Sequence, residues 1–277
     1  LVRNERNMNT AMERLSTGQR INSAADDAAG LAIASRMTSQ IKGLETGVRN
    51  ANDAISMIST ADGALVEVGN MLQRMRELAL QASNGTTASA DRDYLNMEYE
   101  NLITEIERIA QNTQWNGKTI LTGDADSTDD STVAFQVGAN GGQTIAVNFG
   151  DISQSGAATF AQFQLSAHAG SESHISGATT AAAQTHITGV LTYVDSAITA
   201  VNTQRATYGA AINQLTYAVD NLSNVMVNSE AARSRIADTD YAQETSELAR
   251  TQIIQQAGTA MLAQANQLPQ TVLSLLQ

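Results

Sequence analysis

The chain has 277 residues and a formal net charge of −12, because 28 acidic residues outnumber 16 basic ones. Such an acidic chain is a poor candidate for binding nucleic acid or for insertion into an anionic membrane, since both need clustered positive charge. The lack of cysteine excludes disulfides, thiolate metal sites and a cysteine nucleophile, while one proline and 4% aromatic residues favour long helices over a loop-built enzyme site.

Residues 37–82 carry the first extended helical pattern. Apolar residues recur there in alternating steps of four and three, which places them on one stripe of a helix. Two successive steps of three at Ile58 form a stammer, which overwinds a coiled coil locally without ending the helix. Asn84 and Gly85 end it, and a shorter seam over residues 95–109 predicts a second helix that folds back antiparallel.

Residues 133–149 change to a period of two, which predicts a β-hairpin around a glycine-rich turn. Its alternating apolar residues are Val133, Phe135, Val137, Ile145, Val147 and Phe149. The following residues, 151–185, are mostly small and polar, and they predict a surface insertion with little core of its own.

Residues 187–236 keep strict four-three alternation from Ile187 to Ile236. A helix of that length measures about 75 Å and needs packing partners along it, and the two upstream helices are the candidates within the chain. The patterns together predict a mainly α fold: a long-helix coiled-coil bundle with a small β-hairpin region.

Both ends of the chain carry apolar helical stripes for which we see no cover within the chain. Uncovered stripes of this kind indicate partner chains. The stripe residues, which we interpret as polymerisation stripes, are Met8, Met12, Leu15, Leu248, Ile254, Met261, Leu268, Val272 and Leu275.

Three acidic or histidine groups could suggest metal or acid–base chemistry. Calcium could bind to a cluster of four carboxylates, those of Asp124, Asp126, Asp129 and Asp130. In an EF-hand loop starting at Asp124, however, Asp129 stands where glycine is needed and Phe135 where glutamate is needed. We therefore interpret the cluster as an acidic loop exposed to solvent. His168, His174 and His186 lack the HExxH spacing of a zinc peptidase. Asp26 and Asp27 precede an apolar run and indicate charge compensation at a helix N-terminus. We therefore predict no metal, no cofactor and no enzyme activity.

Five sequence blocks closely resemble bacterial flagellin, and they occur in that family's order over most of residues 10–150 and 190–277. The amino-terminal block reads ERLSTGQRINSAADDAAG from Glu13 to Gly30. The other blocks are Leu72–Ala79, Phe135–Asn140, Ala232–Ala242 and Gln256–Gln267.

The resemblance implies the following organisation. Residues 1–21 are an N-terminal inner-core helix whose start lies upstream of Leu1, and residues 237–277 are the C-terminal inner-core helix that pairs with it. Residues 22–150 and the long helix 187–236 form the surrounding core. Residues 151–186 are a short variable surface insertion, shorter than the outer domains of many members.

The resemblance also implies a function and partners. The subunit polymerises with itself into the extracellular flagellar filament used for swimming, and it is secreted through the flagellar type III apparatus. An export chaperone holds its C-terminal segment, and hook-associated and cap proteins adjoin the filament. Flagellins recognised by Toll-like receptor 5 use a core helix surface that matches Arg74, Leu78, Gln81 and Arg108 here, although Thr104 replaces an acidic residue usual on the facing helix.

Two other functions compete with this hypothesis. A hook–filament junction protein has similar ends, but the continuous match through the hairpin and the tail favours flagellin. A cell-surface binding protein on a flagellin scaffold, for instance for polysaccharide, would use aromatic stacking, yet Trp115 is the single tryptophan and stands beside a turn.

Overall fold

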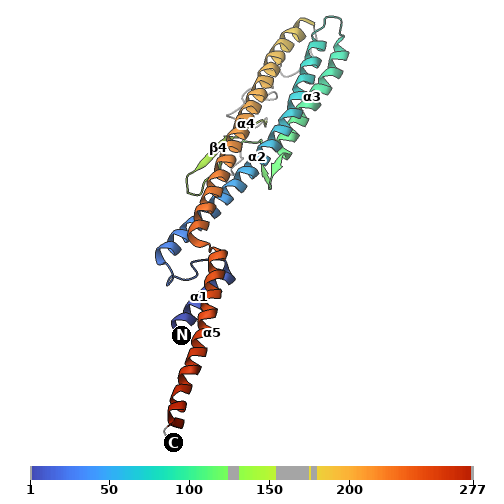
Figure 1. The fold of residues 1–277 in the computed structure, drawn as a ribbon. Helices are drawn as coiled ribbons and strands as arrows, with labels where there is room; N and C mark the ends of the chain where they lie inside the picture. Colours follow the sequence, from blue (N-terminus) through green and yellow to red (C-terminus); the bar gives the residue numbers. More distant parts are fainter. Residues whose placement is uncertain (1, 124–130, 154–174, 176–179, 276–277) are drawn as a thin grey trace. The chain divides into compact units, whose positions relative to one another are not determined.

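The computed structural model describes residues 2–123, 131–153, 175 and 180–275, with the backbone alone at 180–185 and 266–275 (Figure 1). The described chain divides into two compact units. The terminal unit comprises Leu1–Gly43 and Asn224–Gln277, and the central unit comprises Leu44–Ser223. The elements in chain order are α1 Val2–Thr17, α2 Ala28–Ala82, α3 Ser89–Asn112, β1 Gln114–Trp115, β2 Lys118–Thr119, β3 Thr132–Gln136, β4 Thr144–Asn148, α4 Thr180–Ala237 and α5 Tyr241–Leu275.

The mainly α fold is confirmed, as are the long helices and the hairpin. Helix α2 runs without a break through the stammer at Ile58 and ends at Ala82, ahead of Asn84 and Gly85. Helix α4 begins at Thr180 and not at residue 187. The reason is local, because Ala181–Ala183 are strong helix formers that extend the helix into residues we had assigned to the insertion.

In the central unit, α2, α3 and α4 enclose one apolar core (Figure 1). Leu65, Leu72 and Leu78 of α2 are fully buried in it with Tyr99 of α3 and Tyr208 of α4. Ion pairs mark the antiparallel register of α2 and α4: Arg76 contacts Asp195 at 2.6 Å, and Arg205 contacts Asp62 at 2.9 Å. These pairs are exposed and screened by solvent, so the core and not the charges stabilises the unit.

The buried seam of α4 is rotated relative to the one expected from the sequence. From Ile187 to Leu215 every second expected position is buried, whereas the expected positions between them, such as Arg205, lie at the edge of the seam. Other side chains take their places, and one of these, Gln204, is hydrogen-bonded to the hairpin. The buried residues of this stretch are Ile187, Val190, Val194, Ala197, Val201, Gln204, Tyr208, Ala211 and Leu215.

Strands β3 and β4 form the expected hairpin, with Val133 opposite Val147 and Phe135 opposite Ile145. Helix α4 holds the hairpin through two side chains. Gln204 Nε2 donates a hydrogen bond to the Asn148 carbonyl at 2.7 Å, and the Tyr208 hydroxyl donates to the Phe149 carbonyl at 2.7 Å. Burial raises the pKa of the Tyr208 phenol well above its ordinary value.

On its other side the hairpin end meets α2. Asn50 Nδ2 donates a hydrogen bond to the Gln136 carbonyl at 3.0 Å. One turn earlier, a Cβ on Gly47 would lie only 2.6 Å from the Val137 carbonyl oxygen. Glycine at this position therefore lets strand backbone and helix backbone touch.

A smaller hairpin follows α3, where β1 pairs antiparallel with β2. Asn116 and Gly117 form its turn with φ of 49° and 79°. Positive φ at both central residues is the geometry of a two-residue hairpin turn, and this is the turn expected beside Trp115.

Some sequence hypotheses concern residues outside the described ranges. Asp124, Asp126, Asp129 and Asp130 lie there, as do His168 and His174. Ile175, which is described, is fully buried, and its backbone N–H donates a hydrogen bond to Asn96 Oδ1 at 3.0 Å. Among the helices of the described residues, none combines the length and the apolar character needed to cross a bilayer.

A pair of glycine substitutions tests the close approach of hairpin and helix. Gly63 lies on the exposed face of α2 with open space around it, so Gly63→Ala should stabilise the protein by about 0.5–1 kcal/mol. Gly47→Ala should instead destabilise it by about 1–3 kcal/mol, because the methyl group displaces the Val137 carbonyl. Urea denaturation followed by circular dichroism measures both, and equal stability of the two variants would contradict the docking.

Candidate functional site

The two connectors of the terminal unit pair with each other. Gln19, between α1 and α2, forms an antiparallel bridge with Asp238, between α4 and α5. The Arg20 N–H donates to the Ala237 carbonyl at 2.7 Å, and the Thr239 N–H donates to the Gly18 carbonyl at 3.1 Å. These bonds hold the first residues after α1 beside the last residues before α5.

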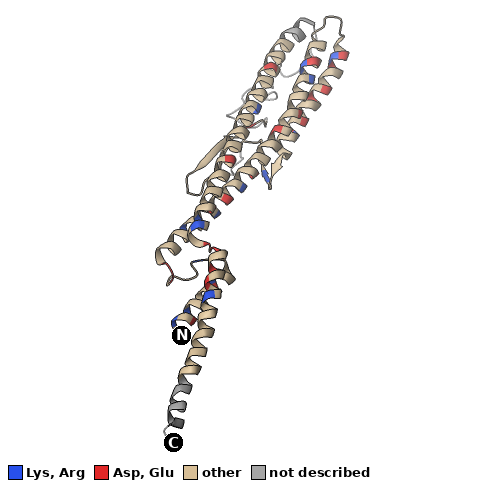
Figure 2. Ribbon diagram, in the orientation of Figure 1, with Lys and Arg blue, Asp and Glu red and all other residues tan. Residues whose placement is uncertain are grey.

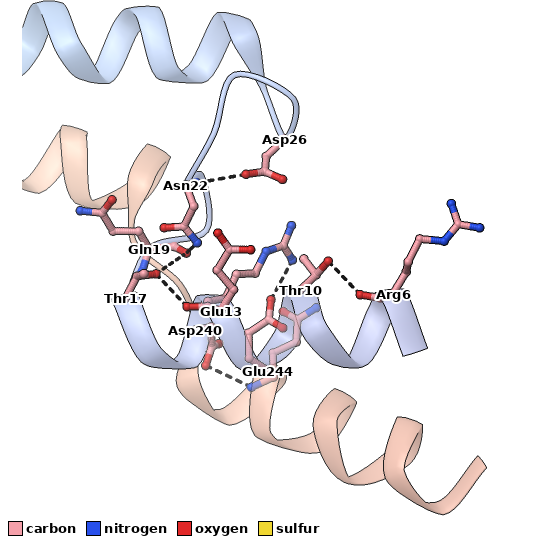
Figure 3. Close-up of polar contacts among 11 residues, drawn as sticks. Arg6, Thr10, Glu13, Thr17, Gln19, Asn22, Asp26, Asp240 and Glu244 are labelled. Carbon is pink, nitrogen blue, oxygen red and sulfur yellow. Dashed lines mark hydrogen bonds and ion pairs between the residues drawn. The ribbon is translucent and has the colours of Figure 1, made fainter. Parts of the chain in front are cut away.

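A short polar loop leads from this bridge into α2. The Asp26 carboxylate accepts hydrogen bonds from the backbone N–H groups of Ser23 at 2.8 Å and Asn22 at 3.1 Å (Figure 3). These bonds, the Ser23 contacts first, hold the pKa of Asp26 below its ordinary value. Asp27 Oδ1 accepts from the Gly30 N–H at 2.8 Å and so caps α2. Asp27 has the expected role at the helix N-terminus, whereas Asp26 mainly closes the loop.

Helices α1 and α5 pack antiparallel through polar and small side chains. Asn4 Nδ2 donates a hydrogen bond to the Thr251 carbonyl at 2.7 Å, and Arg14 Nη1 contacts Glu244 Oε1 at 2.9 Å. Figure 3 shows Glu244 directed from α5 toward α1. Ala11 and Thr251, at the centre of the pairing face, are 2% and 1% exposed. The terminal unit thus uses polar contacts where the central unit uses apolar ones.

Several large apolar side chains of the pair are exposed. Ile253 and Ile254 are 66% and 47% exposed, although both lie within the part of α5 beside α1. Met12 of α1 is 55% exposed, and Met261 and Leu262 of α5 are 70% and 51% exposed. Exposed apolar residues in such a run indicate a surface that another chain covers.

Charge is absent from the same part of α5. No Asp, Glu, Lys or Arg occurs after Arg250, and Figure 2 shows no charged residue along α5 beyond that point within its described part. A surface without charges can be buried without the cost of desolvating an ion. We name the exposed residues Met12, Ile253, Ile254, Met261 and Leu262 the terminal apolar face. Its four members on α5 span about half of the helix circumference.

The predicted polymerisation stripes match this face in part. Met12, Ile254 and Met261 are exposed as expected. Our assumption that no part of the chain covers the stripes was wrong for the other described members, because the α1–α5 pair half-buries them: Met8, Leu15 and Leu248. The side chains of Leu268, Val272 and Leu275 lie outside the described part of the structure.

The sequence pattern missed Ile253 and Leu262. A single stripe along α5 includes Ile254 and excludes its neighbour, since adjacent helical residues are about 100° apart. Ile253 and Leu262 are identified only by their exposure in the structure, in which α1 packs against α5. The lack of charge after Arg250 is the sequence signal that could have found this broader surface.

The residues matched to receptor recognition differ in exposure. Leu78 is fully buried in the core of the central unit, so it does not lie on the exposed surface of this unit. Arg74, Gln81 and Arg108 are exposed. Arg74 Nε donates to Glu98 of α3 at 2.9 Å and Nη1 to Glu77 at 3.1 Å, and these bonds, that to Glu98 first, raise its pKa. Three exposed apolar residues that we had not considered lie in the same hairpin of helices: Leu80, Tyr94 and Met97.

The terminal unit also contains a cavity of about 310 Å³ between the start of α2 and the last turn of α4. Arg233 and Asp238 line it together with apolar residues such as Ile21 and Leu31. The described residues hold no group of three or more His, Asp or Glu side chains placed to bind a metal. No convergent nucleophile, acid and base lines the cavity.

Comparison with known proteins gives a consistent result. The model of the bacterial flagellin N-terminal helical region matches residues 1–126, and that of the C-terminal helical region matches residues 191–276. A flagellin of Halalkalibacterium halodurans is 45% identical over 268 residues, covering 96% of this chain and 91% of that protein. A flagellin of Bacillus subtilis is 44% identical over 278 residues, with the same two shares of 96% and 91%.

A solved structure agrees with this result. The crystal structure of Bacillus cereus flagellin has a TM-score of 0.50 and 31% identity, and the match covers 63% of this chain and 88% of that one. The resemblance inferred from the sequence blocks is therefore confirmed.

The pairing of α1 with α5 predicts a specific cost for losing its ion pair. The Glu244 side chain is only 12% exposed, so Arg14→Gln leaves its carboxylate poorly solvated and should weaken the pairing by about 1–2 kcal/mol, between the values for exposed and enclosed pairs. Hydrogen exchange of α1 amides measures the loss. Arg250→Gln removes an exposed pair to Glu247 and should leave exchange within experimental error. Equal effects of the two variants would refute the pairing.

Proposed function

The chain belongs to the bacterial flagellin family, which makes it a structural subunit of the extracellular flagellar filament, and we propose that its copies polymerise by burying the terminal apolar face. The observation that carries the proposal is the exposure of Ile253 and Met261 on a helix whose polar face is already occupied by α1. Motility follows from the filament, which a rotary motor turns as a propeller.

The magnitude of the burial suits a cooperative polymer. Covering an Ile, Leu or Met side chain that is about half exposed is worth about 1 kcal/mol, so the five residues of the face contribute about 5 kcal/mol per subunit. Association costs a comparable amount in lost freedom. A subunit that buried this face against one neighbour alone would bind weakly, and contacts with several neighbours make the polymer stable.

The form of the polymer follows from the symmetry of its contacts. The terminal apolar face is uncharged, and it therefore offers no charge pattern that would pair it with an identical face in a fixed two-fold arrangement. Contacts between different patches of identical subunits extend as an open helix when the rotation between them does not close a ring. We infer such a heterologous contact here.

Other partners implied by the family would use the same surface. An export chaperone that holds residues 237–277 would cover the face before assembly, and hook-associated and cap proteins would cover it at the filament ends. A hook–filament junction protein and a cell-surface binding protein remain the alternatives, and polymers that form from the purified chain alone favour the filament subunit over both.

A second proposed function is recognition by Toll-like receptor 5 through Arg74, Gln81 and Arg108. Their exposure supports it, whereas the burial of Leu78 removes the apolar member of the surface.

One substitution separates polymerisation through the terminal apolar face from polymerisation through other surfaces. Ile253→Asp places a charge in a contact that excludes water, and it should raise the critical concentration for polymerisation by about tenfold or more while leaving the helix content unchanged. Sedimentation of polymers measures the critical concentration. Gln252→Asp adds the same charge to an exposed polar position of the same turn and should have a much smaller effect. A normal critical concentration for the Ile253→Asp variant would contradict the proposal.

The receptor proposal has its own test. Arg74→Ala should lower the response of receptor-bearing reporter cells at least several-fold, because it removes an exposed cation at the centre of the proposed contact. Arg49→Ala, which removes another exposed arginine of α2, paired to Glu45, is the matched control. Recognition would be contradicted if the wild-type protein gave no response. It would also be contradicted if both variants gave the same response as the wild type.

A further inference from the structure

Methionine sulfur is concentrated on the terminal apolar face. The chain has nine methionines and no cysteine, so thioethers are its most readily oxidised side chains. Among the described methionines, Met12, Met97 and Met261 are the exposed ones, at 55%, 61% and 70%. Met57 and Met75 are enclosed in the core at 5% and 0%. Two of the three accessible sulfurs therefore lie on the surface that assembly has to bury.

We propose that Met12 and Met261 are sites of reversible oxidation by peroxides, and that their sulfoxides prevent the subunit from entering the filament. The inference rests on the proposed role of the terminal apolar face. In the reaction the thioether sulfur attacks one oxygen of hydrogen peroxide and the O–O bond breaks. Sulfur gains that oxygen and is oxidised by two electrons, while the other oxygen leaves as water.

The product is unsuited to the contact for a physical reason. A sulfoxide is polar and accepts hydrogen bonds strongly, whereas the thioether is apolar and flexible. The other members of the face, Ile253, Ile254 and Leu262, have hydrocarbon side chains, which donate no hydrogen bond to a sulfoxide that is buried against copies of them. Burying an unpaired acceptor among them should raise the critical concentration for polymerisation by about tenfold.

Access to the two sulfurs depends on the assembly state. In the free subunit they are open to solvent, whereas in the polymer the face is covered and peroxide is excluded. Oxidation should therefore act on subunits before assembly and spare those already in filaments. If the methionines had only a structural role, the effect of peroxide would not depend on whether it is added before or after polymerisation.

The test uses the full chain and hydrogen peroxide. Subunits are treated either before or after polymerisation, peptide mass spectrometry measures sulfoxide at each methionine, and sedimentation measures assembly. Treatment of free subunits should modify Met12, Met97 and Met261, leave Met75 intact and reduce assembly about tenfold. Treatment after polymerisation should leave Met12 and Met261 intact.

Leucine variants identify the responsible sulfurs. The double variant Met12→Leu, Met261→Leu conserves apolar volume and should assemble after peroxide treatment, whereas Met97→Leu should remain sensitive. Loss of assembly in the treated double variant, or full assembly of wild-type subunits oxidised at both sites, overturns the proposal.

A second experiment with reductases tests the proposal even if the double variant fails to assemble without peroxide treatment. Methionine sulfoxide reductases for both epimers should restore the assembly of oxidised wild-type subunits, and failure to restore it overturns the proposal. Failure of the proposed polymerisation itself can be distinguished from failure of the oxidation proposal, because wild-type subunits would then not polymerise even without peroxide.

Discussion

The packing of α1 against α5 is the interaction on which the proposed behaviour of this protein depends. Its contacts are amide and ion-pair hydrogen bonds around small side chains, such as those of Asn4, Arg14 and Ala11. Because polar and small side chains occupy the centre of the pairing face, Met8, Leu15 and Leu248 are only half-buried, and Met12, Ile253, Ile254 and Met261 are left exposed. A conventional apolar seam would have consumed these side chains within one subunit. The polar seam instead reserves them for other copies of the chain.

The central unit follows the opposite rule. Its three helices bury their leucines, alanines and two tyrosines in one core, and the hairpin is bound to α4 by Gln204 and Tyr208. Burial on this scale stabilises a fold without help from neighbours. The terminal unit has few buried side chains in its described part, among them Ala11, Ile21 and Ala34. The same chain therefore combines a self-sufficient bundle with a pair of helices that is completed by assembly.

Hydrophobic periodicity predicted the helices, the hairpin and their order, since both signals depend only on which residues are apolar. It placed the seam of α4 slightly wrongly, because the buried positions also include two alanines and Gln204, whose side chain is hydrogen-bonded to the end of β4. It could not predict the polar contacts of the α1–α5 pairing, such as that of Asn4 with Thr251, because a hydrophobic pattern treats these residues as solvent-facing. Leu78 illustrates the same limit, because a motif matches a residue type and not its exposure.

The central claim is that copies of the chain cover the terminal apolar face. A helical reconstruction of the polymer by cryo-electron microscopy, at a resolution that shows side chains, tests it most directly. The account predicts that Met12, Ile253 and Met261 are enclosed by side chains of neighbouring subunits. A filament in which these three side chains face open solvent would contradict it.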